Sequence, residues 1–155
     1  MPGPPPLSTR LICQLHVELG AVQEIGTLAS GRRRVVPIVG GRVEGPQLQG
    51  EVLGGGADWQ LVAPDGSATI EARYTLRASD GGLILVHSRG IRNGPPALLA
   101  RLAAGEAVDP SEYYFRTLVT LETDAPAHAW VNRRLFIAVA ARDPAAVVID
   151  LYEVQ

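Results

Sequence analysis

The segment SATIEARYTLRA, residues 67–78, decides the fold class because its polar and apolar residues alternate one by one. One set consists of Ile70, Ala72, Tyr74 and Leu76, and the alternate set consists of Glu71, Arg73, Thr75 and Arg77. An alternation of period two predicts a β-strand with one buried face. The segment alone does not say whether its charged face meets bulk water or lines a pocket. That question decides whether the domain has a site on this sheet.

The rest of the chain continues this pattern between Gly, Pro and Asp residues. It predicts strands near residues 11–19, 34–43, 48–53, 58–62, 69–77, 83–88, 113–121, 130–140 and 147–154. About nine strands with short connections are typical of an antiparallel barrel or sandwich. The sequence therefore predicts a single all-β domain over residues 8–155, preceded by a flexible, proline-rich tail over residues 1–7.

One segment, PPALLARLAAGE, has the pattern of a short helix over residues 95–104. Its two prolines suit the first turn of a helix, and Gly105 suits the end. Leu98, Leu99 and Leu102 share one face, so we expect the helix to cover a sheet or one end of a barrel as a structural lid.

Two Asp-Gly pairs set the expected strand registers, if Asp65-Gly66 and Asp80-Gly81 each form a two-residue turn. The resulting cross-strand pairs are Asp58–Arg73, Gln60–Glu71, His87–Tyr74 and Ser88–Arg73. These registers sort polar side chains onto one face and place Trp59 with the apolar set. A slipped register would mix the two faces.

The polar face has two readings. In the first it is the exterior, and Asp58–Arg73 is an exposed ion pair worth well under ~1 kcal/mol. In the second it lines a pocket or contacts another copy of the chain, because the assumed register places the apolar Ile84 and Val86 on the same side. Residues of both charge signs beside apolar ones can bind and polarise a ligand.

An ordered set of segments resembles a known family. The segments GRRRVVPIVGGRVEG, LQGEVLGGGADWQLV, ATIEARYTL, SRGIRNGPP, DPSEYYFRT and AWVNRRLFIAVA follow one another as in the small bacterial and fungal proteins of the domain of unknown function 3237 family. The resemblance extends from about Leu11 to Val154. It implies a single antiparallel β-barrel, lipocalin-like in outline, with no assigned general activity. Family members often have Asp where this chain has Glu71.

The resemblance also favours the second reading of the polar face. A barrel of this size can hold one small ligand. The implied cavity residues are Asp58, Glu71, Arg73, Arg116 and Asn132, with Trp59, Tyr113 and Trp130 as walls or mouth. Since Asp58 and Trp59 are neighbours on one strand, alternation excludes that all of these side chains point inward.

Composition excludes several kinds of chemistry. All 14 basic residues are Arg, so a Schiff-base lysine is excluded. Cys13 is the single cysteine and lies in an apolar run, which excludes an intrachain disulfide and favours a buried thiol. The three histidines lack metal-ligand spacing, and we expect neither a metal nor a cofactor.

The expected partners and location follow from charge and the N-terminus. A net charge of −2 with few aromatic residues predicts neither nucleic-acid nor membrane binding. The N-terminus lacks the pattern of a signal peptide, so we expect a cytoplasmic protein. Association of copies into a homo-oligomer is left open.

Three functional hypotheses remain. The first is a cofactor-independent enzyme of the isomerase, cyclase, hydratase or lactone-opening type that acts on a small carboxylate- or carbonyl-bearing metabolite. In it Glu71, Arg73 and Asp58 are catalytic, and Trp59, Tyr113, Arg116, Trp130 and Asn132 bind the ligand. The second is a carrier or sensor barrel with the same pocket and no turnover. The third is a structural or oligomer-forming β-domain without a site.

Overall fold

Strand β1 closes a barrel, because it pairs with β10 on one side and with β3 on the other. The computed structural model describes residues 1–155. Its strands are β1 (Thr9–Leu19), β2 (Gln23–Leu28), β3 (Gly31–Glu44), β4 (Gly50–Val52), β5 (Gly56–Val62), β6 (Ala68–Ala78), β7 (Leu83–Asn93), β8 (Tyr114–Glu122), β9 (Phe136–Arg142) and β10 (Ala146–Val154). The helices are α1 (Pro96–Ala103) and the short 3-10 helices η1 (Pro110–Glu112) and η2 (Pro126–Arg133). The prediction of a mostly-β antiparallel barrel is confirmed.

The ten strands occupy eight positions of the barrel wall, because two positions hold a broken strand. Strands β4 and β5 both lie between β3 and β6, separated by residues 53–55. Strand β2 continues the course of β1 along β3 after residues 20–22. Neighbouring positions are consecutive along the chain and antiparallel, which makes this an up-and-down barrel.

Both Asp-Gly turns differ from the expected ones. Ala63 N donates to Ser67 O and Ala78 N donates to Gly82 O, so each loop has three residues. The third residue of each loop, Gly66 at φ 88° and Gly81 at φ 91°, adopts the left-handed conformation that glycine favours. The two-residue turns and the registers built on them are therefore wrong by one residue.

That single residue changes which side chains share a face. The observed partners are Ala57 with Arg73, Asp58 with Ala72, Ala72 with Ser88, and Arg73 with His87. Asp58 therefore lies on the opposite sheet face from Arg73. The apolar residues of β6 point into the barrel and are buried, whereas its charged residues point outward. The prediction that this charged face lines a cavity is wrong.

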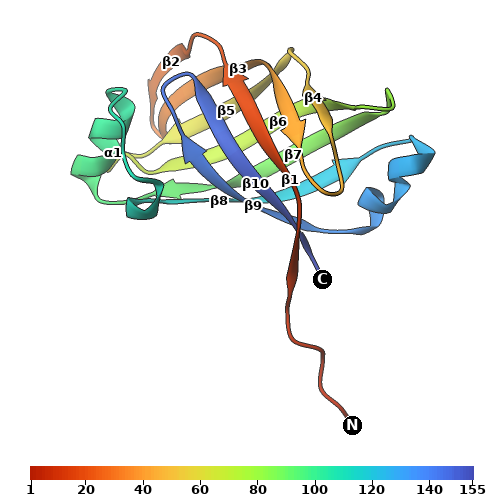
Figure 1. Cartoon of the computed structure of the whole chain (residues 1–155). Helices are drawn as coiled ribbons and strands as arrows, with labels where there is room; N and C mark the ends of the chain where they lie inside the picture. The colour runs from red at the N-terminus through yellow and green to blue at the C-terminus, as the bar shows by residue number, and fades with distance from the viewer.

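The two ends of the barrel differ in what covers them. Figure 1 shows α1 at one end, and the η2 segment, drawn in lighter blue, at the other. The helix agrees with its prediction, with Pro96 in the first turn and Leu99 buried beside Gly66. The interior also contains a packed core in which Phe136, Leu76 and Leu151 are 1% exposed.

Two parts of the chain differ from the predicted strands. Residues 130–133, expected as the start of a strand, belong to η2, and only Phe136–Arg142 forms β9. The Asn132 side chain determines this turn, because its Oδ1 accepts from Thr123 N and its Nδ2 donates to Thr123 O. Strand β2 was not predicted at all, since it buries no side chain and Ile25 is 59% exposed.

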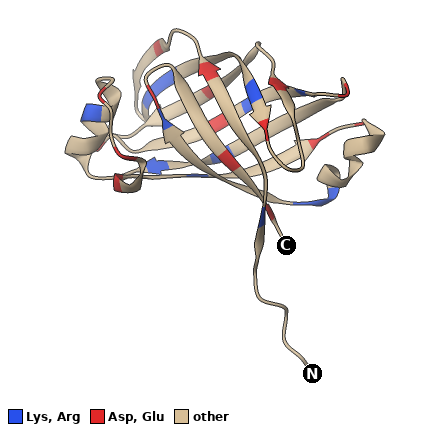
Figure 2. Ribbon diagram, in the orientation of Figure 1, with Lys and Arg blue, Asp and Glu red and all other residues tan.

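Charges of both signs are spread along the ribbon (Figure 2). One carboxylate is buried at the crossing of the chain ends, where Glu153 is 4% exposed. Arg10 and Arg134 bind it at 2.7 and 3.0 Å, which ties β1 and the loop after η2 to β10. The Arg10 guanidinium also lies 5.6 Å from the centre of the Trp130 ring, so β1 contacts the η2 segment as well.

Candidate functional site

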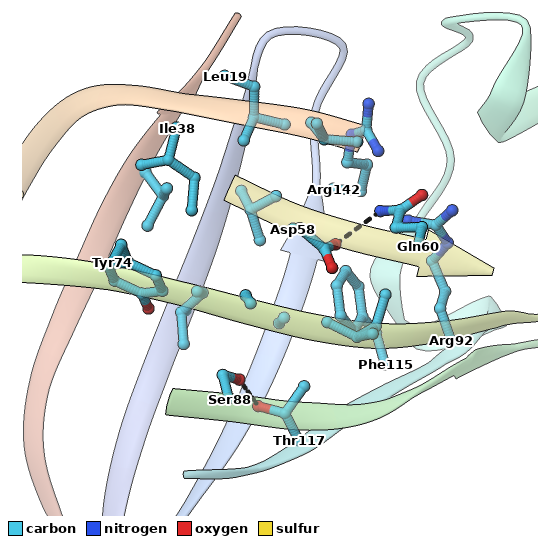
Figure 3. Close-up of a pocket in the computed structure, with 17 residues that line it drawn as sticks. Leu19, Ile38, Asp58, Gln60, Tyr74, Ser88, Arg92, Phe115, Thr117 and Arg142 are labelled. Carbon is cyan, nitrogen blue, oxygen red and sulfur yellow. Dashed lines mark hydrogen bonds between the residues drawn. The ribbon is translucent and has the colours of Figure 1, made fainter. Parts of the chain in front are cut away.

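The barrel interior contains a cavity at the end covered by α1. It offers about 50 Å³ to the centres of water molecules, within roughly 530 Å³ of space between atoms that partly opens to solvent. Since one water needs about 10–15 Å³ by this measure, the cavity has room for a few water-sized groups, and its open side adds further space. Most lining residues are apolar, and the polar ones besides Tyr74 are Asp58, Gln60, Ser88, Arg92, Thr117 and Arg142. Figure 3 shows that these polar side chains come from β5, β7, β8 and β9.

Asp58 is the one carboxylate that lines the cavity, and it is 9% exposed. Its Oδ2 accepts from Gln60 Nε2 at 2.8 Å (Figure 3), and its Oδ1 accepts from the Glu71 backbone N–H at 3.0 Å. Burial raises the pKa of Asp58, and these hydrogen bonds and the charges of Arg92 and Arg142 only partly oppose that effect. The site therefore holds a carboxyl group that takes up a proton more readily than a surface aspartate does.

Two guanidinium groups lie near Asp58 at the mouth of the cavity. Arg92 is 7% exposed and its guanidinium carbon lies 5.6 Å from the centre of the Phe115 ring. Burial, and next the charge of Arg142, lower the pKa of Arg92 to about 10. The pKa of Arg142 is also lowered, mainly by burial and then by Arg34. Two cations and one carboxylate make the site electropositive at neutral pH, which favours an anionic ligand.

Two further polar residues of the cavity are hydrogen-bonded to each other. Ser88 Oγ donates to Thr117 Oγ1 at 2.7 Å, and both residues are buried. These hydroxyls lie on the β7–β8 wall of the cavity, below Arg92 (Figure 3). Their hydroxyl groups can donate and accept hydrogen bonds in an otherwise apolar wall.

The predicted catalytic residues do not converge. Asp58 points into the cavity, but Glu71 and Arg73 lie on the outer face of β6, where their side chains are 38% and 61% exposed. Glu71 Oε1 lies 2.6 Å from His87 Nε2 and 3.9 Å from Arg73 Nε. The outer cluster is therefore a solvated ion-pair group, because alternation along β6 turns odd-numbered positions outward.

The predicted ligand-binding residues are also scattered. Trp59 is 40% exposed on the outside of β5. Arg116 lies outside β8, where its guanidinium donates to Phe115 O and lies 5.2 Å from the centre of the Tyr114 ring. Trp130 and Asn132 belong to η2 at the opposite end of the barrel.

Tyr113 has a closer relation to the cavity. It is 6% exposed, and its hydroxyl oxygen accepts from the backbone N–H of Arg142 at 2.9 Å. It thereby supports the strand end that carries one of the two guanidiniums. Of the five predicted ligand-binding residues, Tyr113 and Arg116 each form a hydrogen bond with a residue that lines the cavity, Tyr113 with Arg142 and Arg116 with the backbone oxygen of Phe115.

Several site residues were missed from the sequence: Gln60, Ser88, Arg92, Thr117 and Arg142. A signal for two of them was present. Gln60 has the same parity as Asp58 on its strand, and Arg92 has the same parity as Ser88. The assumed two-residue turns already placed Gln60 and Ser88 on one face with Asp58. A three-residue loop at each Asp-Gly pair would have put Ile70 and Ala72 on that face in place of Glu71 and Arg73.

Three further features concern metal binding, the reactivity of the cysteine and the helices. No group of three His, Cys, Asp or Glu side chains lies close enough to hold a metal ion. Cys13 is fully buried, and burial raises its pKa to about 12, so the thiol stays protonated and is a poor nucleophile. None of the helices has the length and hydropathy needed to cross a membrane.

The chain is similar in sequence to known proteins. A UPF0311 protein of Rhodopseudomonas palustris is 41% identical over 150 residues, covering 97% of this chain and 98% of that protein. A UPF0311 protein of Clostridium acetobutylicum is 41% identical over 125 residues, covering 81% of this chain and 79% of that protein.

Solved structures agree in fold. The crystal structure of a conserved R. palustris protein of unknown function has a TM-score of 0.93 at 39% identity and covers 98% of this chain and 100% of its own. A β-barrel-like protein of Acinetobacter baumannii has a TM-score of 0.87 at 40% identity and covers 99% of each chain.

A more distant structure, an enzyme from Penicillium herquei, has a TM-score of 0.74 at 17% identity, covers 100% of this chain and 99% of its own, and shares the fold alone. The family described as "Protein of unknown function (DUF3237)" matches residues 7–154. Together with relatives about 40% identical over nearly the whole length, this match establishes that the chain belongs to the DUF3237 family.

Proposed function

We propose that the interior cavity binds a small carboxylate- or carbonyl-bearing molecule and that Asp58 exchanges a proton with it, without a cofactor. The observation that carries this proposal is the buried Asp58 carboxyl group with its raised pKa, facing a mostly apolar cavity. A carboxyl group whose pKa moves toward neutral pH is suited to general acid–base catalysis.

The groups around Asp58 also support proton exchange with a bound ligand. Gln60 and the Glu71 N–H hold its two oxygens in one orientation, so the carboxyl group does not need to reorganise when a ligand enters. Arg92 and Arg142 supply positive charge where an enolate or carboxylate oxygen would be stabilised. We therefore assign anion binding to these two residues and not to Arg73 or Arg116, which lie on the outer face of the barrel.

A carrier or sensor without turnover is the second candidate. It is favoured by the tight, mostly apolar enclosure, which is typical of binding barrels. The fold is compatible with either function, since the P. herquei enzyme shares it, and fold alone does not determine activity.

One experiment separates the two candidates. The protein is incubated in D₂O with a set of small 2-oxo acids, 3-oxo acids and γ-lactones, and NMR follows ligand binding, deuterium incorporation and ring opening. We expect at least one compound to bind and react, and Asp58→Asn to slow that reaction by about 100-fold or more while binding persists. The matched control is Glu71→Gln on the outer face, which should leave both unchanged.

Two outcomes would contradict the proposed enzyme, and they lead to different conclusions. Binding with no difference between the native protein and Asp58→Asn in any reaction would identify a carrier. Absence of binding by every compound would reject the proposed site.

Association of copies of the chain, which the sequence leaves open, is kept here as a proposal. Leu118 and Ile91, on the outside of β8 and β7, are 69% and 53% exposed, and exposed apolar side chains on one face favour protein contacts. Sedimentation velocity over a range of concentrations tests it, and a single monomeric species at every concentration would contradict it.

A further inference from the structure

Two buried polar atoms of the cavity have no hydrogen-bond partner in the protein. They are Arg92 Nη1 and Gln60 Oε1, and their residues are 7% and 2% exposed. Both residues line the same cavity, and Figure 3 shows the Arg92 guanidinium beside the Gln60 amide. Since buried polar groups in proteins are nearly always hydrogen-bonded, this pair requires an explanation.

The orientation of Gln60 follows from its neighbour. Gln60 Nε2 donates to Asp58 Oδ2, and the reversed amide would place its oxygen against a carboxylate oxygen. While Asp58 is ionised, Gln60 therefore presents an acceptor on the side away from Asp58. Only a group that carries a donor hydrogen can satisfy it.

Arg92 presents the opposite requirement. Neither Arg92 nor Arg142 has a carboxylate within 4.0 Å, although nine other arginine–carboxylate contacts form elsewhere. Arg92 therefore offers a charged donor with no anion beside it. A guanidinium in an enclosed site binds a carboxylate well, because both the charge and the planar geometry match.

We infer that the ligand of the proposed site is a hydroxy- or enol-carboxylate, with the carboxylate on Arg92 and the hydroxyl donating to Gln60 Oε1. This inference rests on the proposed function and narrows its substrate class. One molecule with an anionic acceptor next to a donor satisfies both atoms at once. Its remaining carbon atoms lie against the apolar wall around Ile70 and Val36, with Asp58 beside the hydroxyl-bearing carbon.

The test compares acids that differ only in the hydroxyl group. Isothermal titration measures binding of 2-hydroxybutyrate, 3-hydroxybutyrate and butyrate, together with inorganic phosphate. We expect one hydroxy acid to bind about three- to tenfold more tightly than butyrate, which corresponds to one net hydrogen bond. Phosphate should bind more weakly than any of these acids, because it has no apolar part.

Two variants assign the contacts. Gln60→Met should remove the preference for the hydroxy acid and leave butyrate binding within about threefold, since one neutral hydrogen bond is lost. Arg92→Met should weaken all of the acids by about tenfold or more, as expected for a hydrogen bond to a charged group. Arg101→Met on the exterior of α1 is the matched control and should change neither value.

The failures can be told apart. Absence of binding by every acid, butyrate included, would reject the proposed function. Binding of butyrate and both hydroxy acids with equal affinity would reject the further inference and leave the proposed function standing. Equal or tighter binding of phosphate would show a site for an inorganic anion and also overturn the inference. If Arg92→Met does not fold, the inference is decided by the native protein alone, through the ratio of its affinities for the hydroxy acids and for butyrate.

Discussion

Two charged clusters lie back to back across the same wall of the barrel, and they differ in almost every physical property. On the outside, Glu71 is surrounded by His87, Arg73 and Arg89, all of them partly or largely exposed. On the inside, Asp58 is enclosed with Gln60 and Arg92, and burial raises its pKa. Water screens the outer ion pairs, whereas the inner groups interact in a medium of lower polarity.

The comparison teaches that residue types alone do not identify a site. The outer cluster has the richer mixture of Glu, His and Arg, and it is the one that the sequence points to. The inner cluster has the unusual electrostatics, because its groups have lost their water. The predictions below test that difference.

The largest expected effect comes from truncating the two carboxylates. Asp58→Ala should lower the free energy of unfolding by about 1–3 kcal/mol, since it leaves the buried Gln60 Nε2 and the Glu71 N–H without their acceptor. Glu71→Ala should lower it by less than about 1 kcal/mol, as for exposed ion pairs. Urea unfolding of both variants measures the contrast, and equal losses would contradict the different environments.

The pH dependence of stability sharpens the contrast further. The folded-state pKa of Asp58 lies above its ordinary value of 3.8, so the protonated carboxyl group stabilises the folded protein. This contribution is complete below the ordinary value and is lost as the pH rises through the raised, folded-state pKa.

Asp58→Asn removes the titration and keeps the size of the side chain and one acceptor oxygen. The native protein should therefore lose stability relative to Asp58→Asn as the pH rises from about 3 to 8. Urea unfolding at several pH values gives the difference, and an opposite slope would show that Asp58 is stabilised as a carboxylate.

A smaller effect is expected for Arg73→Ala. Its side chain is 61% exposed and lies 3.9 Å from Glu71, so the variant should lose less than about 1 kcal/mol of stability. Added salt should diminish even this loss, because exposed charges are screened. A loss of several kcal/mol in thermal or urea melts would instead place Arg73 in the interior.

The smallest effect concerns the two tryptophans. Trp59 is 40% exposed on the outer wall, whereas the centre of the Trp130 ring lies 6.0 Å from that of Phe136 and its neighbour Val131 is buried. Acrylamide should quench the fluorescence of Trp130→Phe, which retains Trp59, more strongly than that of Trp59→Phe. Trp59→Phe should change stability by no more than about 0.5 kcal/mol. Equal quenching would contradict the outward position of Trp59.

Much of the fold could be predicted, because local alternation and turn residues carry it. The strand at Ser67–Ala78 and the helix with Pro96 in its first turn agree with the structure to within one or two residues. The candidate site could not be predicted in the same way. Asp58 was identified, but its assumed partner Arg73 lies on the other face, since one additional loop residue reverses the pairing.

The sequence by itself determined that the chain is a mostly-β barrel of one family, with one short helix and neither lysine nor disulfide chemistry. These properties follow from residue identity and short-range periodicity. Only the tertiary structure decided which charged groups are inside. Arg92 and Arg142 come from strands that lie far from Asp58 in the chain, and barrel closure brings them to one cavity. Their burial, and hence the raised pKa of Asp58, depends on every strand of the wall, because no single strand excludes water.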